Sequence, residues 1–399
     1  MYRCSEESKV ERAAIIGVGW YGLRPTTPEV SFREMVFEAA TRAYEDAGID
    51  PRQDVDAFLS AQEDFWEGIA IADEFAPEPL GGVLRPTVTV AGDGLQALAN
   101  AVMLVQTGFF DIVVVEAHGK PSDIASLGEI YEFALDPIHH RPVKPAHPLF
   151  MMAFDAQAYM MRTGADPSHL ALVAAENRAR GLRNPRASYA AKISVDEVLE
   201  AETIMDPLTR YDIAGYVDAA IVLVVARESV AKKLTDKPVF IDGIGYATET
   251  GTGTLEWHSW GRMPSMRIAA MTAYAQAGIG DPLSSTDFAE VEDRASHYQL
   301  IALEELGLAP EDQAHKLYER GEYELDGYYP VNPSGGSLAM GVALEATGLV
   351  RLLEAVLQLR GEAGGHQIDG VERAIVASWR GPPTTTSMVA VLSGPEMGF

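Results

Sequence analysis

The sequence is poor in cysteine, in basic residues and in long apolar runs. Its only cysteine among 399 residues is Cys4, near the start of the chain, so an internal disulfide is impossible and a cysteine nucleophile is not expected. Lysine and arginine number 31 against 58 aspartates and glutamates, which gives a net charge of −27. Because a nucleic acid or an anionic membrane surface would repel such a chain, we expect neither as a partner.

Several recognisable signals are missing as well. No apolar run reaches the length of a membrane span, and the first residues lack a long apolar segment followed by a cleavage site, which favours a cytoplasmic protein. There is no phosphate loop, GxSxG elbow or CxxC pair. The segment 17–22, GVGWYG, fits a dinucleotide fingerprint by letter, but Leu23-Arg24-Pro25 breaks the helix that would have to follow it.

The histidines of one loop do not form a metal site by spacing. His139, His140 and His147 lie close in sequence, but their separation fits no metal-binding motif, which favours solvated or structural histidines. We therefore expect neither a metal nor a resident cofactor.

The composition that remains is that of a soluble α/β protein. Hydrophobic residues make up 47% and charged residues 22%, and the length favours two fused domains. Apolar strand-like runs alternate with helical spacing, which is typical of a sheet covered by helices on both faces. Strands are predicted at 13–17, 56–61, 86–90, 111–117, 218–226, 239–247, 288–291, 374–379 and 387–392, and helices at 32–49, 95–107, 264–278 and 295–307.

The order of elements repeats along the chain. The run VFIDGIGYA from Val239 repeats the strand-ending-on-glycine pattern of AAIIGVG from Ala13, which indicates a duplicated βαβαβ unit. We predict an N-terminal half from 1–117 and 202–235, joined by a polar linker at 232–237 to a C-terminal half from 236–399. Residues 118–201, rich in methionine, histidine and aromatic residues, form an inserted loop or cap region over the site.

The stretch 331–348, VNPSGGSLAMGVALEATG, is the most distinctive of the sequence. An extended run breaks on Asn-Pro-Ser-Gly-Gly, and apolar residues then recur at helical spacing through Leu359. It resembles the glycine-rich turn of the thiolase superfamily, N-x-x-G-G-x-(I/L)-A-x-G-H-P-x-G-x-(S/T)-G. Val342-Ala343 replaces the His-Pro of that motif, and Glu345 replaces the glycine that follows.

Three other loops carry the same resemblance, which covers nearly the whole chain. TVAGDGLQAL from Thr89 is similar to A-C-A-S-G-L-Q-A-L, with Ala91 where the family has its nucleophilic cysteine. AEVED from Ala289 is similar to N-E-A-F, or to H-D-C-F in the sterol-carrier branch, with Glu292 and Asp293 in its two polar positions. In ASWRGPP from residue 377, Trp379 falls near the family's second cysteine.

The resemblance implies a thiolase fold, with two duplicated βαβαβ halves in a five-layer αβαβα architecture. It also implies that the covalent chemistry is gone, because Ala91, Val342 and Trp379 replace the two cysteines and the histidine. The loops nevertheless hold other reactive groups, and carboxylates gathered in a partly dry cleft would raise one another's pKa. We name as candidate catalytic residues Glu292, Asp93, Tyr298, Asp293, Glu345 and His297, and as candidate substrate-binding residues Gly341, Val342, Gly335, Gly336, Ala91 and Trp379.

Each candidate also has a plain structural interpretation. Asp93 can cap the helix that begins near Leu95, and Glu292 and Asp293 can pair with Arg294 or cap the helix that follows. Tyr298 can be a core ring whose hydroxyl is hydrogen-bonded. Glu345 is harder to explain in this way, because a charge at the start of an apolar helix needs a partner or water.

Cysteine-free thiolase-like proteins resemble the lipid-transfer-protein or steroid side-chain aldolases. These cleave a β-hydroxyacyl-CoA by a retro-aldol reaction that needs no acyl-enzyme, giving a ketone or aldehyde and a shorter acyl-CoA. For this chain we predict Glu292 or Asp93 as the base, Tyr298 as the acid or orienting group, and main-chain N–H groups near Gly341 as the groups that hold the thioester oxygen. The chain departs from those aldolases at Glu292 and Val342, where they have tyrosines.

The resemblance also implies partners. An acyl-CoA would be the substrate, with a bulky, apolar acyl group, of which a steroid is one example. A homodimer formed through the N-terminal half would work with a small subunit that combines a zinc ribbon and an oligonucleotide-binding fold. Two other functions stay open: a degenerate subunit that scaffolds an active partner, and thiolase or acyltransferase chemistry completed by another subunit.

Overall fold

The computed structural model describes residues 10–63, 72–125, 127–128, 148–249, 258–381 and 386–398. The loop that holds the three clustered histidines lies outside these ranges. The N-terminal half and the inserted region contain, in order, β1 (Ala13–Arg24), α1 (Phe32–Ala47), α2 (Pro51–Asp54), β2 (Ala57–Ala61), α4 (Ala72–Phe75), α5 (Pro77–Leu80), β3 (Thr87–Val90), α6 (Gly94–Gln106), β4 (Ile112–Gly119), α8 (Pro148–Thr163), α9 (Pro167–Gly181), α10 (Val195–Leu199), β5 (Thr203–Met205), β6 (Leu208–Thr209), β7 (Asp218–Arg227) and α11 (Glu228–Leu234).

The second half repeats this alternation of strands and helices. Its elements are β8 (Val239–Thr248), α12 (Pro264–Ala277), α13 (Pro282–Ser285), β9 (Phe288–Glu290), α14 (Ser296–Glu305), α15 (Ala314–Glu319), α16 (Gly336–Met340), η2 (Leu344–Ala346), α17 (Thr347–Leu359), β10 (Arg373–Arg380) and β11 (Thr386–Ser393). All of the strands predicted from the sequence are present; most ends differ by one or two residues, but β1 extends seven residues beyond its predicted end at Gly17.

The large sheet has the strand order β3-β2-β4-β7-β1-β8-β11-β10-β9. It is mixed: β2 pairs in parallel with β3 and β4, β9 pairs in parallel with β10, and the central strands are antiparallel. Within the sheet, the two halves meet where residues 13–15 of β1 pair with residues 239–241 of β8. Each half therefore keeps its own five-stranded or four-stranded part of the sheet.

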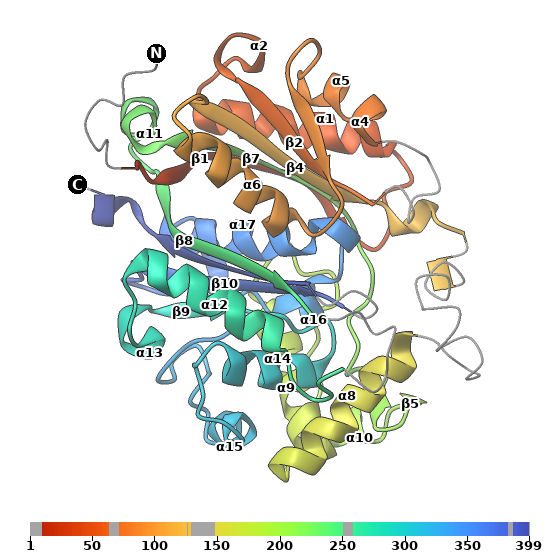
Figure 1. The fold of residues 1–399 in the computed structure, drawn as a ribbon. Coiled ribbons are helices and arrows are strands. Elements are labelled where there is room, and N and C mark those ends of the chain that lie inside the picture. The colour runs from red at the N-terminus through yellow and green to blue at the C-terminus, as the bar shows by residue number, and fades with distance from the viewer. Residues whose placement is uncertain are drawn as a thin grey trace.

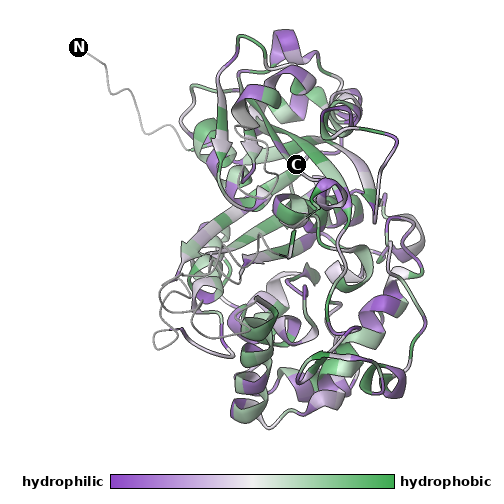
Figure 2. Ribbon diagram, turned by 90° about the vertical axis from the view of Figure 1, so that its right-hand side faces the viewer, coloured by the Kyte–Doolittle hydropathy of each residue, from purple (hydrophilic) through white to green (hydrophobic). Residues whose placement is uncertain are grey.

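Helices cover both parts of the sheet in five layers (Figure 1). The helix α1 lies on the outer face of the N-terminal part, α6 and α17 lie between the two parts, and α12 and α14 cover the C-terminal part. This is the αβαβα architecture that the sequence predicts. Hydrophobic residues follow the strands and the inner faces of the helices, as the green segments of Figure 2 show. No helix in the described part of the chain is long and apolar enough to cross a membrane.

Paired glycines explain both the repeat and the false dinucleotide fingerprint. A Cβ atom at Gly17 or Gly19 would lie 2.3 or 2.0 Å from a carbonyl oxygen of α1, so these glycines let α1 pack directly on β1. Gly243 and Gly245 of β8 stand in the same relation to α12, at 2.0 and 2.3 Å. GVGWYG is thus part of a strand that continues to Arg24, and the same device recurs in the second half.

Two predicted boundaries are wrong. The segment 232–237 is not a linker throughout, because α11 continues to Leu234. The helix expected directly after Gly341 begins only at Thr347, since a short 3-10 turn, η2, intervenes. Both errors concern the end or the start of a helix, which local sequence spacing does not locate precisely. The boundaries of the inserted region, which contains α8, α9 and α10, stay a prediction.

Candidate functional site

The buried guanidinium of Arg351, on α17, joins the loops that the sequence singled out. Its Nη1 lies 3.0 Å from Glu292 Oε2, and its Nη2 lies 3.5 Å from Asp293 Oδ1. The same two nitrogens donate to the hydroxyls of Ser378 and Ser337. All of these side chains are buried. Three of the four loops that resemble thiolase motifs therefore meet at the Arg351 guanidinium.

Glu292 is an ion-paired carboxylate with both oxygens occupied. Oε1 accepts hydrogen bonds of 2.9 Å from the main-chain N–H and from Nε of Arg294, and Oε2 accepts one of 3.2 Å from the Trp379 N–H. Burial alone would raise the pKa of Glu292, but the charges of Arg294 and Arg351 lower it to about 2. The pairing with Arg294 is confirmed. A carboxylate so acidic and so fully bonded is a poor general base, so the geometry speaks against that role.

Asp93 caps a helix, as its alternative interpretation held. Its Oδ1 accepts from the N–H of Leu95 at 2.9 Å, and its Oδ2 accepts from the N–H of Gly348 and from the hydroxyl of Ser378, both at 3.0 Å. Burial raises its pKa. These bonds tie the starts of α6 and α17 to the end of β10, so we assign Asp93 a structural role and withdraw it as a base.

Asp293 holds the glycine-rich turn. It accepts hydrogen bonds from the N–H groups of Ser337 at 2.7 Å and Leu338 at 3.2 Å, and from Asn177 Nδ2 at 2.9 Å. Gly336 has a φ of +59°, and a Cβ there would lie 2.1 Å from Asp293 Oδ2. Glycine is required at that position because the carboxylate approaches the main chain so closely. Gly335, with a φ of +94°, begins the same turn.

Glu345 differs from the other carboxylates of this set in its hydrogen bonding. Its Oε1 accepts from Arg380 Nη2 at 2.9 Å, and Arg380 also pairs with Glu63 at 2.5 Å. Its Oε2 is buried and has no hydrogen-bond partner in the described part of the protein. Burial raises the pKa of Glu345 to about 7, although the charge of Arg380 lowers it. This side chain can hold or release a proton near neutral pH.

Tyr298 lies in an aromatic cluster with His297 and Trp379. The ring centroids lie 4.0 Å apart for Tyr298 and His297 and 4.7 Å apart for Tyr298 and Trp379. The Tyr298 hydroxyl donates to Asp155 Oδ2 at 3.1 Å, and burial together with that carboxylate raises its pKa well above the ordinary value. It is therefore a core ring with a bonded hydroxyl, and transfer of its own proton would leave a phenolate beside a carboxylate.

His297 is buried without a charge. Neither ring nitrogen has a hydrogen-bond partner within the described residues, and burial lowers its pKa to about 3. The indole Nε1 of Trp379 is also buried and unpartnered there. At neutral pH the imidazole cannot donate a proton as a cation.

The three positions that replace acyl-transfer residues have different surroundings. Ala91 is exposed between β3 and α6, whereas Val342 and Trp379 belong to the same apolar core as Tyr298. The main chain at Val342 is bonded to the segment before β7: its N–H donates to the Gly215 carbonyl at 2.8 Å. The side chains present offer no nucleophile for an acyl group at these positions.

The N–H groups near Gly341 are not available to a thioester oxygen. Gly341 donates to the Ser337 carbonyl at 2.8 Å, Val342 to Gly215, and Ala343 to Thr347 Oγ1 at 3.1 Å. The predicted oxyanion site at Gly341 is therefore wrong. The positive φ of Gly341, +104°, serves the turn between α16 and η2.

Sequence reasoning missed four polar residues that contact the candidates or their partners. Arg351 and Arg380 are the cations that the candidate carboxylates use, and Asp155 and His258 extend the network beyond Tyr298. An arginine in the apolar run of α17 is a visible signal, because a buried charge needs a partner. Asp155 and His258 belong to no motif and meet only in the folded protein.

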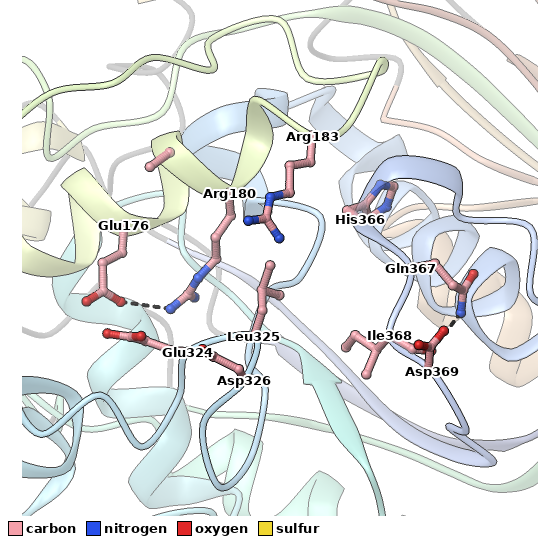
Figure 3. Close-up of a pocket in the computed structure, with 11 residues that line it drawn as sticks. Glu176, Arg180, Arg183, Glu324, Leu325, Asp326, His366, Gln367, Ile368 and Asp369 are labelled. Atoms are coloured by element: carbon pink, nitrogen blue, oxygen red, sulfur yellow. Dashed lines mark hydrogen bonds and ion pairs between the residues drawn. The ribbon is translucent and has the colours of Figure 1, made fainter.

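A separate cavity of about 510 Å³ lies between α9 and the segments 324–326 and 366–369 (Figure 3). Arg180 pairs there with Glu176, with Nη2 2.7 Å from Oε2. None of the candidate site residues lines this cavity. Among the described residues no group of three or more histidine, cysteine, aspartate or glutamate side chains is arranged to hold a metal ion.

Comparison with known proteins places this geometry in a family. A family model described as thiolase C-terminal domain-like matches residues 249–394. The chain is 32% identical to the acetyl-CoA acetyltransferase of Methanothermobacter thermautotrophicus, over 86% of this chain and 90% of that protein. The chain belongs to the thiolase superfamily.

Other thiolase-superfamily proteins are similar along most of the chain. Sterol carrier protein 2 of Bos taurus is 28% identical, over 91% of this chain and 69% of that protein. A solved structure of an Ltp2-ChsH2(DUF35) aldolase superposes with a TM-score of 0.83 at 24% identity, covering 96% of this chain and 98% of that one. A monomeric SCP2-thiolase-like protein from Mycobacterium smegmatis has a TM-score of 0.73 at 20% identity, over 96% and 78% of the two chains. These two structures support the fold.

Replacing Glu292 tests its structural role. We expect Glu292→Gln to lower the free energy of unfolding by about 3 kcal/mol or more, because Arg351 would lose its closest anion while staying buried. Denaturant unfolding of the wild type and the variant measures the difference. The control is Glu362→Gln, which breaks the exposed pair with Lys237 and should cost about 1 kcal/mol or less. Equal effects of the two substitutions would contradict the assignment.

The depressed pKa of His297 gives a pH-dependence with a defined sign. The unfolded chain protonates this imidazole below its ordinary pKa of 6.5, whereas the folded protein resists until about pH 3, so stability is lost as pH falls through that window. Between pH 5.5 and 4.5 we expect the wild type to lose about 1.4 kcal/mol more than His297→Leu, measured by denaturant unfolding at each pH. Parallel curves for the two proteins would show that His297 can take up a proton in the fold.

Proposed function

We propose that this protein cleaves the Cα–Cβ bond of a β-hydroxyacyl-CoA by a retro-aldol reaction, releasing a ketone or aldehyde and a shorter acyl-CoA. One observation carries the proposal. The positions of the thiolase nucleophile, histidine and second cysteine hold Ala91, Val342 and Trp379, yet the same site keeps a carboxyl, Glu345, with a pKa near 7 and an oxygen that no described residue bonds. The site lacks the groups that covalent acyl transfer needs, but it keeps a carboxyl that can transfer a proton.

The reaction needs only two proton transfers and a place for negative charge. A base takes the β-hydroxyl proton, the Cα–Cβ electron pair becomes the thioester enolate, and an acid protonates the α-carbon. The N–H of Ala91, just before α6, makes no hydrogen bond within the described residues, so it can face the thioester oxygen near the positive end of that helix.

Glu345 is suited to the second proton transfer. With a pKa of about 7 it is partly protonated at neutral pH, and a weak acid of that strength can give a proton to an enolate carbon. Arg380, which bonds its other oxygen, stabilises the carboxylate that results. The apolar surroundings that raise its pKa also keep competing water away.

Exposed aromatic rings suggest the nature of the acyl group. Phe150, Phe154 and Trp260 form a continuous series, with ring centroids 5.8 and 4.6 Å apart, and Phe154 is 47% exposed. Trp260 lies 4.4 Å from His258, next to the Tyr298 network. An apolar surface made of several aromatic rings favours a bulky, ring-bearing acyl group over a short chain.

A non-catalytic role is the second candidate, and a specific observation favours it. Glu292, Asp93 and Asp293 are all fully engaged in holding loops together, as a scaffold would require. A subunit that only supports an active partner would have no use for the raised pKa of Glu345. Acyl transfer completed by residues of another subunit is the third possibility, since relatives are named acetyl-CoA acetyltransferases.

We also propose a homodimer through the edge of the N-terminal part of the sheet. The strand β3 ends the described sheet, and large apolar side chains nearby face solvent: Leu84 is 100%, Val88 52% and Phe109 88% exposed. An unpaired edge beside apolar side chains is a typical pairing surface. The similarity to the Ltp2-ChsH2(DUF35) aldolase supports a further, smaller partner subunit of the DUF35 kind.

An assay with β-hydroxyacyl-CoAs tests the reaction. The protein, alone and with its partner subunit, is incubated with a short 3-hydroxyacyl-CoA and with one that bears a ring at the β-carbon. We expect a carbonyl product and a shorter acyl-CoA by mass spectrometry, with the ring-bearing substrate preferred. We expect Glu345→Gln to lower kcat at least about 100-fold.

The controls separate catalysis from folding and from the other functions. Glu362→Gln, at an exposed pair, should leave the rate unchanged, and circular dichroism should show that Glu345→Gln is folded. Release of free CoA or transfer of an acyl group, without cleavage, would favour acyltransferase chemistry. No turnover with either substrate, with or without the partner, would favour the scaffold.

A lysine placed on β3 tests whether the dimer forms through this edge of the sheet. We expect the wild type to be a dimer by light scattering, and Val88→Lys to shift it toward monomer, because paired strands would bury the ammonium groups against each other. Met271→Lys is the matched control, since Met271 is 62% exposed on α12, on the other half of the protein. A Val88→Lys protein that stays dimeric would place the interface elsewhere.

A further inference from the structure

Buried polar atoms without partners gather around Tyr298. Within the described residues they include both ring nitrogens of His297, Nε1 of Trp379 and Nδ1 of His258. Folded proteins rarely leave buried donors and acceptors unpaired, because water has been removed and nothing replaces it. Of these atoms, Nδ1 of His258 is the one whose ring is also in contact with a buried carboxylate, Asp155.

One of these residues is held by a carboxylate. Nε2 of His258 lies 3.4 Å from Oδ1 of Asp155, and both side chains are buried. Asp155 is itself fixed from two sides: its Oδ1 accepts from the Gly261 N–H at 2.9 Å and its Oδ2 from the Tyr298 hydroxyl at 3.1 Å. Because a carboxylate accepts hydrogen bonds, the hydrogen of the neutral imidazole belongs on Nε2. The unpartnered Nδ1 then carries a lone pair.

The surroundings of the imidazole fit a base that acts on a bound substrate. Trp260 packs edge-on against the ring, and the exposed Phe154 packs on Trp260 in turn. On the polar side the charged neighbours are Asp155 and Glu249, and Glu249 accepts from Ser265. Both neighbours are anions, which stabilise the imidazolium formed when the ring takes a proton.

We infer that His258 is the general base of the proposed retro-aldol reaction and that Asp155 is the positioning residue that orients it. The inference rests on the proposed function. Nδ1 takes the proton of the β-hydroxyl, the oxygen forms a carbonyl with the β-carbon, and the Cα–Cβ electron pair passes to the thioester enolate. Glu345 protonates the α-carbon, and proton exchange with water restores the neutral imidazole and the protonated carboxyl.

Replacement of the base separates the two proton transfers. We expect His258→Gln to lower kcat/KM for cleavage of the ring-bearing β-hydroxyacyl-CoA by about 10²- to 10⁴-fold. Exchange of the α-hydrogens of the shorter acyl-CoA in D2O needs Glu345 but no β-hydroxyl base, so it should persist in His258→Gln and disappear in Glu345→Gln. A misfolded variant would lose both reactions. Cleavage at the wild-type rate in His258→Gln would overturn the inference and leave the proposed function standing.

The positioning role has its own readout. We expect Asp155→Asn to lower kcat and to move the acidic limb of the kcat/KM profile to lower pH, because the imidazolium would lose its carboxylate. The matched control is His169→Gln, which removes a histidine paired with Asp166 at 3.1 Å at the exposed start of α9 and should leave both unchanged. An unmoved acidic limb in Asp155→Asn would overturn the role of Asp155.

A measurement without turnover keeps the inference testable if cleavage is not found. In protein labelled with 15N-histidine, we expect the His258 signals to show hydrogen on Nε2 and a bare Nδ1. Adding 3-hydroxybutyryl-CoA should shift the Nδ1 signal, whereas butyryl-CoA, which lacks the hydroxyl, should not. A hydrogen on Nδ1, or equal responses to the two thioesters, would overturn the assignment of His258. These signals test the assignment of His258 even if the protein does not cleave β-hydroxyacyl-CoAs.

Discussion

The buried cation of Arg351 is the constraint on which the arrangement of the site depends. A guanidinium that is 2% exposed must find anions, and Glu292 and Asp293, both fully buried, supply them. Ser378 links the same cation to Asp93, so α6, α16, α17 and the end of β10 share one network. Removing any one charge would leave the others unpaired inside the protein, which makes these residues inseparable from the fold.

This constraint divides the polar residues of the site into two groups. The carboxylates of the Arg351 network have both oxygens engaged in hydrogen bonds or ion pairs, and the pKa of Glu292 is held at about 2 by the charges of Arg294 and Arg351. Those outside it, Glu345 and His258, each keep a buried atom without a partner in the described structure. Proton transfer needs a free lone pair, which is why the proposed chemistry is assigned to the second group.

Much of the fold could be predicted from the sequence, because it depends on local patterns of apolar residues and glycines. The glycines of AAIIGVG and VFIDGIG mark the two places where a helix packs directly on a strand, and they revealed the duplication. The glycine-rich turn and the loop with Ala91 can also be recognised from the sequence, because they resemble thiolase motifs. What the sequence could not supply were the partners of its carboxylates. Whether Glu292 is a base or an anchor depends on Arg351, 59 positions away, which only the tertiary structure brings to 3.0 Å.

The pair of Asp155 and His258 is a second case in which the sequence alone does not reveal a contact between distant residues. Asp155 lies in an apolar helix and His258 in a loop without a motif, so neither attracts attention in the sequence. Their interaction depends on the tertiary structure. The Tyr298 hydroxyl and the Gly261 N–H donate hydrogen bonds to the Asp155 carboxylate and hold it beside the imidazole. Fixing the carboxylate orients the imidazole, and in the proposed reaction the ring nitrogen that points away from Asp155 faces the substrate. The proposed reactive atoms therefore belong to residues that only the folded chain brings together, rather than to the motif positions where thiolases have their cysteines.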